Sequence, residues 1–306
     1  MNNVKPAGLD PIKVVRDEER REDALCRVAR IMQSCGMPLW GACGFAAFSE
    51  RLLPCRAKGR LPEQARSILC ALFPYALEER AHNISRYAMP PDYHGIVMDM
   101  LEAAVRALSA VFPSHRFVPF ADNSPIPEVA AAARCGLGAV GEHGLLIHPM
   151  YGSWVFIGEI VTDLPLPVQE REVESCLRCG ACRKACPGGA LQENSFFKER
   201  CVSHISQKKG GLTEEEAALL QKSGLIWGCD RCQEVCPMNW NARPTPLAAF
   251  RENAVGMVDE AELGQLEGRA YGWRGEAVLR RNLRIFRGNR GDTKAKPPEK
   301  AETDGR

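Results

Sequence analysis

Hydrophobic positions recur at helical spacing in two parts of the N-terminal half. Residues 14–33 place Leu25, Val28, Ile31 and Met32 on one face, which predicts an amphipathic helix with a polar outer side. Residues 95–112 have the same spacing and predict a second helix. Its apolar positions are Ile96, Val97, Met100, Leu101, Ala104, Val105 and Leu108.

Short apolar runs bounded by turn-forming residues predict strands. These runs are residues 67–75, 116–120, 144–148 and 153–161. An alanine-rich helix is expected from Pro127 to Cys135, with Gly136 as its left-handed C-terminal cap. Helices and strands mix without a regular βαβ rhythm. The pattern therefore indicates an α+β fold built on a mixed sheet.

Breaks in this pattern divide the chain into four predicted segments. Residues 1–165 form the α+β domain, and the stretch "DLPLPVQE" after it reads as a linker. Residues 166–243 hold most of the cysteines, and residues 244–287 keep a short helical pattern. Residues 288–306 are polar and contain proline and glycine, so we expect a disordered tail.

The composition excludes some classes of protein. With 306 residues and 45% hydrophobic content, the chain can bury one large core or two modest ones. A net charge of +2 argues against a polybasic nucleic-acid binder as a whole. No apolar run reaches the roughly 18–20 residues of a membrane span, and the N-terminus lacks a secretory pattern. A cytoplasmic protein with no membrane partner is expected.

Fourteen cysteines are many for a reducing compartment, and they are unevenly placed. Eight of them fall between residues 176 and 236. The other six stand singly, mostly among apolar neighbours, and we interpret them as small buried hydrophobic residues. These six are Cys26, Cys35, Cys43, Cys55, Cys70 and Cys135.

The first cysteine group matches the C-x₂-C-x₂-C-x₃-C-P run of bacterial ferredoxins. It consists of Cys176, Cys179, Cys182 and Cys186, followed by Pro187. Spacings of two residues let a tight turn present three thiolates to three irons of one [4Fe–4S] cluster. The fourth cysteine follows on the helix that leaves the turn, so it points toward a second cluster.

A second group supplies further ligands with Cys229, Cys232 and Cys236, but it lacks a middle cysteine. Cys201, which stands between the groups, fills the vacancy and brings the count to eight thiolates for two clusters. We assign one cluster to Cys176, Cys179, Cys182 and Cys236, and the other to Cys186, Cys201, Cys229 and Cys232. Two zinc ions could also use eight cysteines, but zinc has no use for the ferredoxin triplet.

Residues 120–147 are the best candidate for catalytic chemistry in the first domain. Asp122 and Glu128 flank two prolines on a stiff loop, and the glycines at 136, 138 and 141 follow. Closely spaced glycines allow a backbone to approach a large flat ligand. An aspartate helix cap followed by a glycine terminator would look the same, so this pattern alone leaves both interpretations open.

Longer blocks in order resemble one family. From "DNSPIPE" through "GLGAVGEHGLLI" and "GSWVFIGEIVTDLPL" to both cysteine groups, the chain resembles the epoxyqueuosine reductases of tRNA modification. The upstream "RYAMPPDYH" (residues 86–94) and the later "GCDRCQEVCPMN" resemble segments of the same family. The likeness covers residues 65–243.

The resemblance implies a base-off cobalamin in the N-terminal domain, reduced by the two [4Fe–4S] clusters. The family's reaction is two-electron reduction of the epoxide on the tRNA wobble base, which gives an alkene and water. Asp122 aligns with the proposed proton donor, a carboxylic acid kept protonated in an apolar pocket. Tyr93 and His94 align with residues that line the corrin site, although an ordinary capped turn before the 95–112 helix would also explain them.

The resemblance extends to other site residues and to partners. Glu128, Gly136, Gly138 and Gly141 are assigned to the cofactor site. The expected partners are the anticodon region of tRNA and an external low-potential electron donor such as a flavodoxin or ferredoxin. A monomer is expected.

Several positions depart from the family pattern. Val129 stands where an arginine is expected, Glu142 where a lysine is usual, and "MPP" (residues 89–91) replaces a more flexible basic stretch. The C-terminal part is also short. It still carries basic residues at helical spacing, Arg280, Arg284 and Arg287, which could contact phosphates or form an ordinary solvated face.

Two other functions therefore stand beside the tRNA reductase. One is a related corrinoid-dependent reductase, or an activator of another corrinoid protein, with a different substrate. The other is a two-cluster electron-transfer protein that binds no cobalamin. Retention of cobalamin would separate this last class from the other two.

Overall fold

The computed structural model describes residues 11–168, 171–193 and 195–288. Within these ranges the first domain is built on a four-stranded sheet with the order β1-β2-β6-β3. The strands are β1 (Trp40–Gly44), β2 (Ser67–Pro74), β6 (Val155–Thr162) and β3 (Phe117–Ala121). The α+β class is confirmed. The expected mixed sheet is instead antiparallel at all three pairings, because the pleat has the same two-residue period in either direction and does not reveal strand direction.

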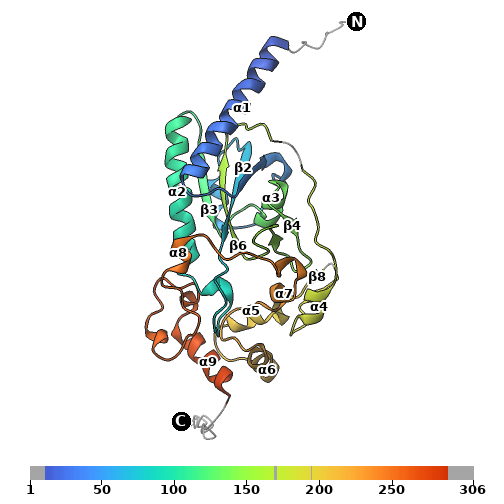
Figure 1. The fold of residues 1–306 in the computed structure, drawn as a ribbon, viewed down its shortest axis with the longest axis vertical. Coiled ribbons are helices and arrows are strands. Elements are labelled where there is room, and N and C mark those ends of the chain that lie inside the picture. Colours follow the sequence, from blue (N-terminus) through green and yellow to red (C-terminus); the bar gives the residue numbers. More distant parts are fainter. Residues whose placement is uncertain (1–10, 169–170, 194, 289–306) are drawn as a thin grey trace, which may run out of the picture.

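Helices cover both faces of this sheet (Figure 1). One face carries α1 (Pro11–Ser34) and α2 (Tyr93–Val111), and the other carries α3 (Glu128–Arg134). All eight residues of β2 are buried: Leu69, Ala71 and Phe73 face the first layer, whereas Ile68, Cys70 and Leu72 face the second. The three predicted helices are confirmed, and Gly136 has the expected left-handed conformation with φ 77°.

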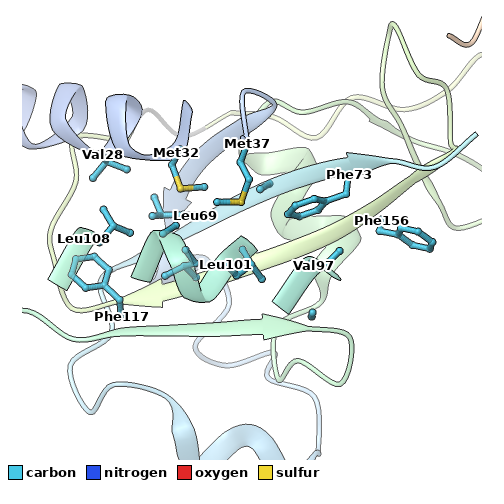
Figure 2. Packing of buried hydrophobic residues seen from close by; sticks show 14 of the residues in the cluster. Val28, Met32, Met37, Leu69, Phe73, Val97, Leu101, Leu108, Phe117 and Phe156 are labelled. Atoms are coloured by element: carbon cyan, nitrogen blue, oxygen red, sulfur yellow. The ribbon is translucent and has the colours of Figure 1, made fainter. Parts of the chain in front are cut away.

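The larger core lies between α1, α2 and the sheet. Figure 2 shows Val28 and Met32 of α1 and Leu101 and Leu108 of α2 converging on Leu69 of β2. Among the six scattered cysteines, those at 43, 70 and 135 are buried as predicted. The one at 26 is exposed, because it lies on the outward face of α1.

Strand β1 was not predicted, because "WGACG" has neither strict alternation nor a long apolar run. It forms through pairing with β2, from Trp40 opposite Ala71 to Gly44 opposite Ser67. A side chain at Gly41 would place its Cβ 2.4 Å from the Cys135 carbonyl oxygen, so the end of α3 packs directly on this backbone.

Shorter elements follow. The small strands are β4 (Ala139–Val140), β5 (Leu146–Ile147), β7 (Leu191–Gln192) and β8 (Ser195–Phe196). The helices of the cysteine-rich part are α4 (Ala181–Ala185), α5 (Val202–Ser206), α6 (Glu214–Ser223) and α7 (Arg231–Glu234). The last two are α8 (Ala248–Arg251) and α9 (Glu276–Arg287). Of the helices in the described ranges, none has the length and apolar character to cross a membrane.

The cysteine-rich part docks onto the loop after β2 through buried polar contacts. Asp230, between two cysteines, accepts hydrogen bonds from the Ser85 hydroxyl and from the Arg86 amide at 2.7 Å. Asn239 accepts from the Ser153 amide and donates to its hydroxyl, both at 2.8 Å. Burying these groups is favourable only when they are paired, so the contacts fix one register between the two parts.

The C-terminal helix α9 also packs on the cysteine-rich part. The Asn282 amide donates to the carbonyls of Ser206 and Ile226 at 2.7 and 2.8 Å. The Arg281 guanidinium donates to the carbonyl of Lys208 at 2.8 Å. Residues 276–287 are therefore integrated into the fold. The predicted tail at 288–306 lies outside the described residues except for Gly288.

The close approach of α2 to the sheet gives a test of the packing. A Cβ at Gly158 of β6 would lie 2.9–3.0 Å from side-chain atoms of Phe73, Val97 and Leu101, all buried. We expect Gly158→Ala to lower the free energy of unfolding by about 1–3 kcal/mol through overpacking. Gly59→Ala, where no atom lies within 4 Å, should change it by less than about 0.5 kcal/mol. Equal values from denaturant unfolding would refute the packing argument.

Candidate redox and proton-transfer site

A cavity of about 390 Å³, here called the central cavity, lies between the sheet domain and the cysteine-rich part. Four of the predicted cluster ligands line it: Cys186, Cys201, Cys229 and Cys232. Its other wall is mainly apolar and includes Val129, Leu145, Val155, Phe156 and Ile157. The structure thus gathers one whole predicted ligand set at a place that the first domain also reaches.

The second predicted set surrounds a smaller hollow, the outer pocket, of about 20 Å³. Its four thiols are those of Cys176, Cys179, Cys182 and Cys236. Cys179 is exposed to solvent, and the neighbouring Leu177 is 69% exposed. Both sets therefore come together as the spacing predicts, whereas iron ligation by each set remains a prediction.

The chemistry of these donor sets fits a positively charged iron–sulfur core. Burial, aided by the charges of Asp230, Cys201 and Cys186, raises the pKa of Cys229 to about 12. Burial and the same neighbouring thiols also raise the pKa of Cys232. Four thiolates repel one another unless cationic iron compensates for their charge. By contrast, no group of three or more His, Cys, Asp or Glu side chains in the described ranges is arranged to hold a single metal ion.

Backbone amides already point at two of the predicted ligand sulfurs. The Glu142 amide donates to Cys176 Sγ at 3.4 Å, and the Ala190 amide donates to Cys186 Sγ at 3.2 Å. Hydrogen bonds to cluster sulfurs stabilise the reduced form of a cluster and tune its potential. The turn between the first cysteines needs left-handed backbone, which Gly180 supplies with φ 71°.

A chain of three ionisable side chains lies at the start of α2. Asp92 caps the helix by accepting from the His94 amide at 3.1 Å, and its Oδ1 lies 2.6 Å from His94 Nδ1. The other ring nitrogen, Nε2, lies 3.2 Å from Asp122 Oδ2. The imidazole therefore bridges two carboxylates, and Asp92 was missed by the sequence analysis because it reads as an ordinary helix cap.

These contacts correct the expected state of Asp122. The hydrogen bond from His94 lowers the pKa of Asp122 and outweighs the opposing effect of burial. The same bond, and then that from Asp92, raises the pKa of His94. Asp122 is 59% exposed rather than enclosed in an apolar pocket. It is ionised, so the available proton resides on the imidazole.

Glu128 takes the role of the buried, proton-holding carboxyl group. It begins α3, and burial followed by the charge of Asp122 raises its pKa to about 7. Asp122 and Glu128 both line a second cavity of about 540 Å³, here called the loop cavity. Val129 lines this cavity and the central one, so the two meet at this residue.

Tyr93 connects the histidine to the central cavity. Its ring stacks on Phe156 with centroids 3.9 Å apart and on His94 with centroids 4.0 Å apart. Phe156 forms part of the central cavity wall. The predicted residues Tyr93, His94, Asp122 and Glu128 thus lie together at one end of the sheet.

The three predicted cofactor glycines lie close to other atoms of the chain. A Cβ at Gly136 would lie 2.5 Å from the Arg171 guanidinium, and one at Gly138 would lie 2.3 Å from a backbone oxygen of β5. At Gly141 it would meet the ring of His143 at 2.4 Å. The residues that line the central cavity do not include these glycines. The left-handed backbone of Gly136 and the backbone contact at Gly138 already account for two of these glycines, and a place for any of the three in a cofactor site stays a prediction.

Comparison with known proteins places these features in a family. Residues 57–123 match the family model described as "Epoxyqueuosine reductase QueG, DUF1730", and residues 175–239 match "4Fe-4S double cluster binding domain". The epoxyqueuosine reductase of Gloeobacter violaceus is 34% identical over 251 residues, which cover 75% of this chain and 78% of that protein. The chain belongs to the epoxyqueuosine reductase family.

Other family members are longer. The Aliivibrio fischeri epoxyqueuosine reductase is 36% identical over 217 residues, which cover 67% of this chain and 58% of that protein. The crystal structure of the Streptococcus thermophilus epoxyqueuosine reductase shares the fold with a TM-score of 0.72 at 22% identity, covering 85% of this chain and 79% of that one. An epoxyqueuosine reductase solved with an epoxyqueuosine-modified tRNA stem loop aligns with a TM-score of 0.71 at 21% identity, covering 88% and 80%.

Two of the three arginines on the basic face of α9 have carboxylate partners. Arg280 pairs with Glu276 and with Glu260, the latter at 2.5 Å, and Arg287 pairs with Glu260 at 3.1 Å. Arg280 and Arg287 therefore have carboxylate partners at the surface, which fits the solvated-face interpretation, whereas phosphate contact by this face stays a prediction.

His143 is a further site residue that the sequence analysis overlooked. The Leu145 amide donates to its Nδ1 at 3.2 Å, which places the ring proton on Nε2. Burial lowers the pKa of His143 to about 4, so the ring is neutral. It lines both the central cavity and the outer pocket. The sequence "GEHG" did not reveal this role, because a single histidine between short residues predicts no particular contact.

The His94 network predicts a measurable titration. In Asp122→Asn we expect the pKa of His94 to fall, because the charged acceptor that stabilises the imidazolium is lost. Stability contributed by the raised pKa is present below the unfolded-state value and is lost as the pH rises through the folded value. NMR titration of the ring measures this shift, and His148 serves as an internal reference. An unchanged His94 pKa would contradict the assigned hydrogen bond.

Proposed function

We propose that this protein is a cobalamin- and iron–sulfur-dependent reductase that converts epoxyqueuosine in tRNA to queuosine. The reaction consumes two electrons and two protons, breaks both C–O bonds of the epoxide and releases water. The protein must therefore deliver electrons and protons to the same place. The chain spans 58% of its Aliivibrio fischeri relative. We therefore base the proposed activity on the residues of this site and not on the activity of the relative.

The observation that carries the proposal is the composition of the central cavity. Four thiols of one predicted cluster lie on one wall, and Phe156, which stacks on Tyr93, lies on the other. The His94–Asp122 pair is the next contact beyond Tyr93. The predicted electron source thus lines the cavity, and a proton source lies behind the opposite wall, beyond the stacked rings of Phe156 and Tyr93.

The first-domain wall of the cavity would suit one face of cobalamin. Its polar lining is sparse, and the apolar side chains on the first-domain wall offer a dry surface for the face of a corrin. When bound, cobalamin supplies the strongly reducing centre that no amino-acid side chain provides. Val129 and Phe156 would contact it from the sheet domain. The family resemblance supports this choice over other redox cofactors.

The ionisable residues then have distinct roles. The His94 imidazolium holds the proton for the departing oxygen at Nε2, and Asp122 orients it and keeps it charged. Glu128, with a pKa near 7, can hold a second proton beside Asp122. In the Bacillus subtilis epoxyqueuosine reductase, solved with its catalytic aspartate loop swung out of the active site, an aspartate loop likewise carries the chemistry.

The solvent exposure of the two cysteine sets indicates the direction of electron flow. The outer set includes the exposed Cys179, whereas the inner set lines the central cavity. We infer that an external donor, a flavodoxin or ferredoxin, reduces the outer cluster. Electrons then pass to the inner cluster and from there into the central cavity.

Turnover of an epoxyqueuosine-modified tRNA stem loop tests the proposal. The anaerobically reconstituted protein should retain added cobalamin with a base-off spectrum and reduce the epoxide. We expect Asp122→Asn to retain clusters and cobalamin but to lose about 10²–10⁴-fold in kcat. The exposed Asp99→Asn on α2 is the matched control and should retain wild-type activity.

The alternatives give different results. Retained cobalamin without epoxide reduction would point to another substrate, which the apolar Val129 in place of the expected arginine also favours. Failure to retain cobalamin, with both clusters intact, would refute the proposal and indicate an electron carrier.

The assignment of the eight cysteines to two clusters can be tested separately. Cys201→Ala should abolish the inner cluster alone, lowering iron from about eight to about four per chain. The mutant should keep the spectrum of the outer cluster. Cys55→Ala, which removes a similarly half-buried thiol outside both sets, should leave the iron content unchanged. Iron near eight in Cys201→Ala would show that this cysteine is not a ligand.

A further inference from the structure

Glu159 is a carboxyl group with no exposed surface in the middle of the sheet. It lies on β6, opposite Cys70 of β2 and Phe120 of β3 in the strand register. The Ser124 hydroxyl donates a hydrogen bond to Oε2, whereas Oε1 has no hydrogen-bond partner among the described residues. A charged carboxylate is costly to bury in such surroundings unless it is paired.

Ser124 ties Glu159 to the loop that carries Asp122. Its hydroxyl oxygen also accepts a hydrogen bond from the Ile126 amide at 3.1 Å. Asp122 and Asn123, just before it, have φ values of 58° and 47°, in the left-handed region that residues other than glycine adopt at a cost. Asp and Asn tolerate this region better than most other residues. The hydrogen bond between Ser124 and Glu159 is a buried contact that holds the loop directly beside them.

The ionisable groups that face Glu159 supply no positive charge. They are Glu128 of α3 and the thiols of Cys43 in β1 and Cys70 in β2. In the described ranges neither glutamate has a cation within the 4.0 Å of an ion pair. Arg134, at the other end of α3, lies over an aromatic ring instead. Burial, and then the charge of Glu128, raises the pKa of Glu159 to about 8.

We propose that Glu159 is a positioning residue whose protonated carboxyl group holds Ser124 and, through it, the loop that presents Asp122. This inference rests on the proposed function in one respect, namely that the loop presents Asp122 to the reaction. Ionisation of Glu159 would place a charge without a counter-ion beside Glu128 inside the sheet. The single hydrogen bond from Ser124 offsets only part of this cost, so water must enter to solvate the charge, which loosens the contact between β6 and the loop.

The sign of the pH effect follows from the raised pKa. The folded state keeps a proton that the unfolded state, with a usual value of 4.5, has lost. The stability contributed by this proton is complete below the unfolded value and is lost as the pH rises through about 8. Wild-type protein should therefore lose both Tm and kcat between about pH 7 and about pH 9.

Glu159→Gln tests this proposal, because it keeps an acceptor oxygen for Ser124 but cannot ionise. We expect its alkaline losses of Tm and kcat to be clearly smaller than those of the wild type. Glu102→Gln, at a half-exposed position on α2, is the matched control and should follow the wild-type profile. Identical pH profiles for Glu159→Gln and wild type would overturn the proposal.

Ser124→Ala provides a second, independent test. The Ser124 hydroxyl favours the ionised form of Glu159, so its removal should move the alkaline loss of Tm to higher pH while kcat falls at every pH. A lowered kcat without this shift would contradict the role of the proton. The Tm measurements need no substrate, so they decide the state of Glu159 even if no epoxyqueuosine is reduced.

Discussion

The fixed contact between the cysteine-rich part and the sheet domain is the constraint on which the site depends. Asp230 lies between two predicted ligands of the inner cluster and is held by Ser85 and Arg86. Asn239, just after the last cysteine, is held by Ser153. Electron transfer falls steeply with distance, so a cluster that could shift against the sheet would serve poorly. Buried hydrogen bonds with one satisfying arrangement prevent such a shift.

The predicted cluster ligands and the acidic side chains lie on opposite sides of the central cavity. The thiols form one wall of the central cavity, and a cationic iron–sulfur core would compensate for the charge of their thiolate forms. The acidic groups lie beyond the other wall, and each is kept in a different state by its surroundings. His94 favours the ionised form of Asp122, whereas burial raises the pKa of Glu128 to about 7 and that of Glu159 to about 8. Three carboxyl groups close in the fold thus have three different proton affinities.

Residue patterns with a local cause were predicted well. The helices at 14–33 and 95–112 and the strand at 67–75 follow from spacing and burial, and the structure has all three. The cysteine spacing led to two sets of four, and the fold brings the same two sets together. The ionisation of Asp122 was predicted wrongly, because it depends on His94, 28 residues earlier in the chain. Nothing in the loop sequence itself reveals that contact.

The sequence by itself determined which chemical groups are available: eight thiols with ferredoxin spacing, an acidic loop, and enough apolar residues for a layered core. Only the tertiary structure decided how they act. It made the sheet antiparallel, joined β1 to β2, packed the backbone of Gly138 against β5, and paired Arg280 and Arg287 of α9 with glutamates. Spacing along the chain limits local geometry, whereas pKa values and cavity walls depend on neighbours that are remote in sequence.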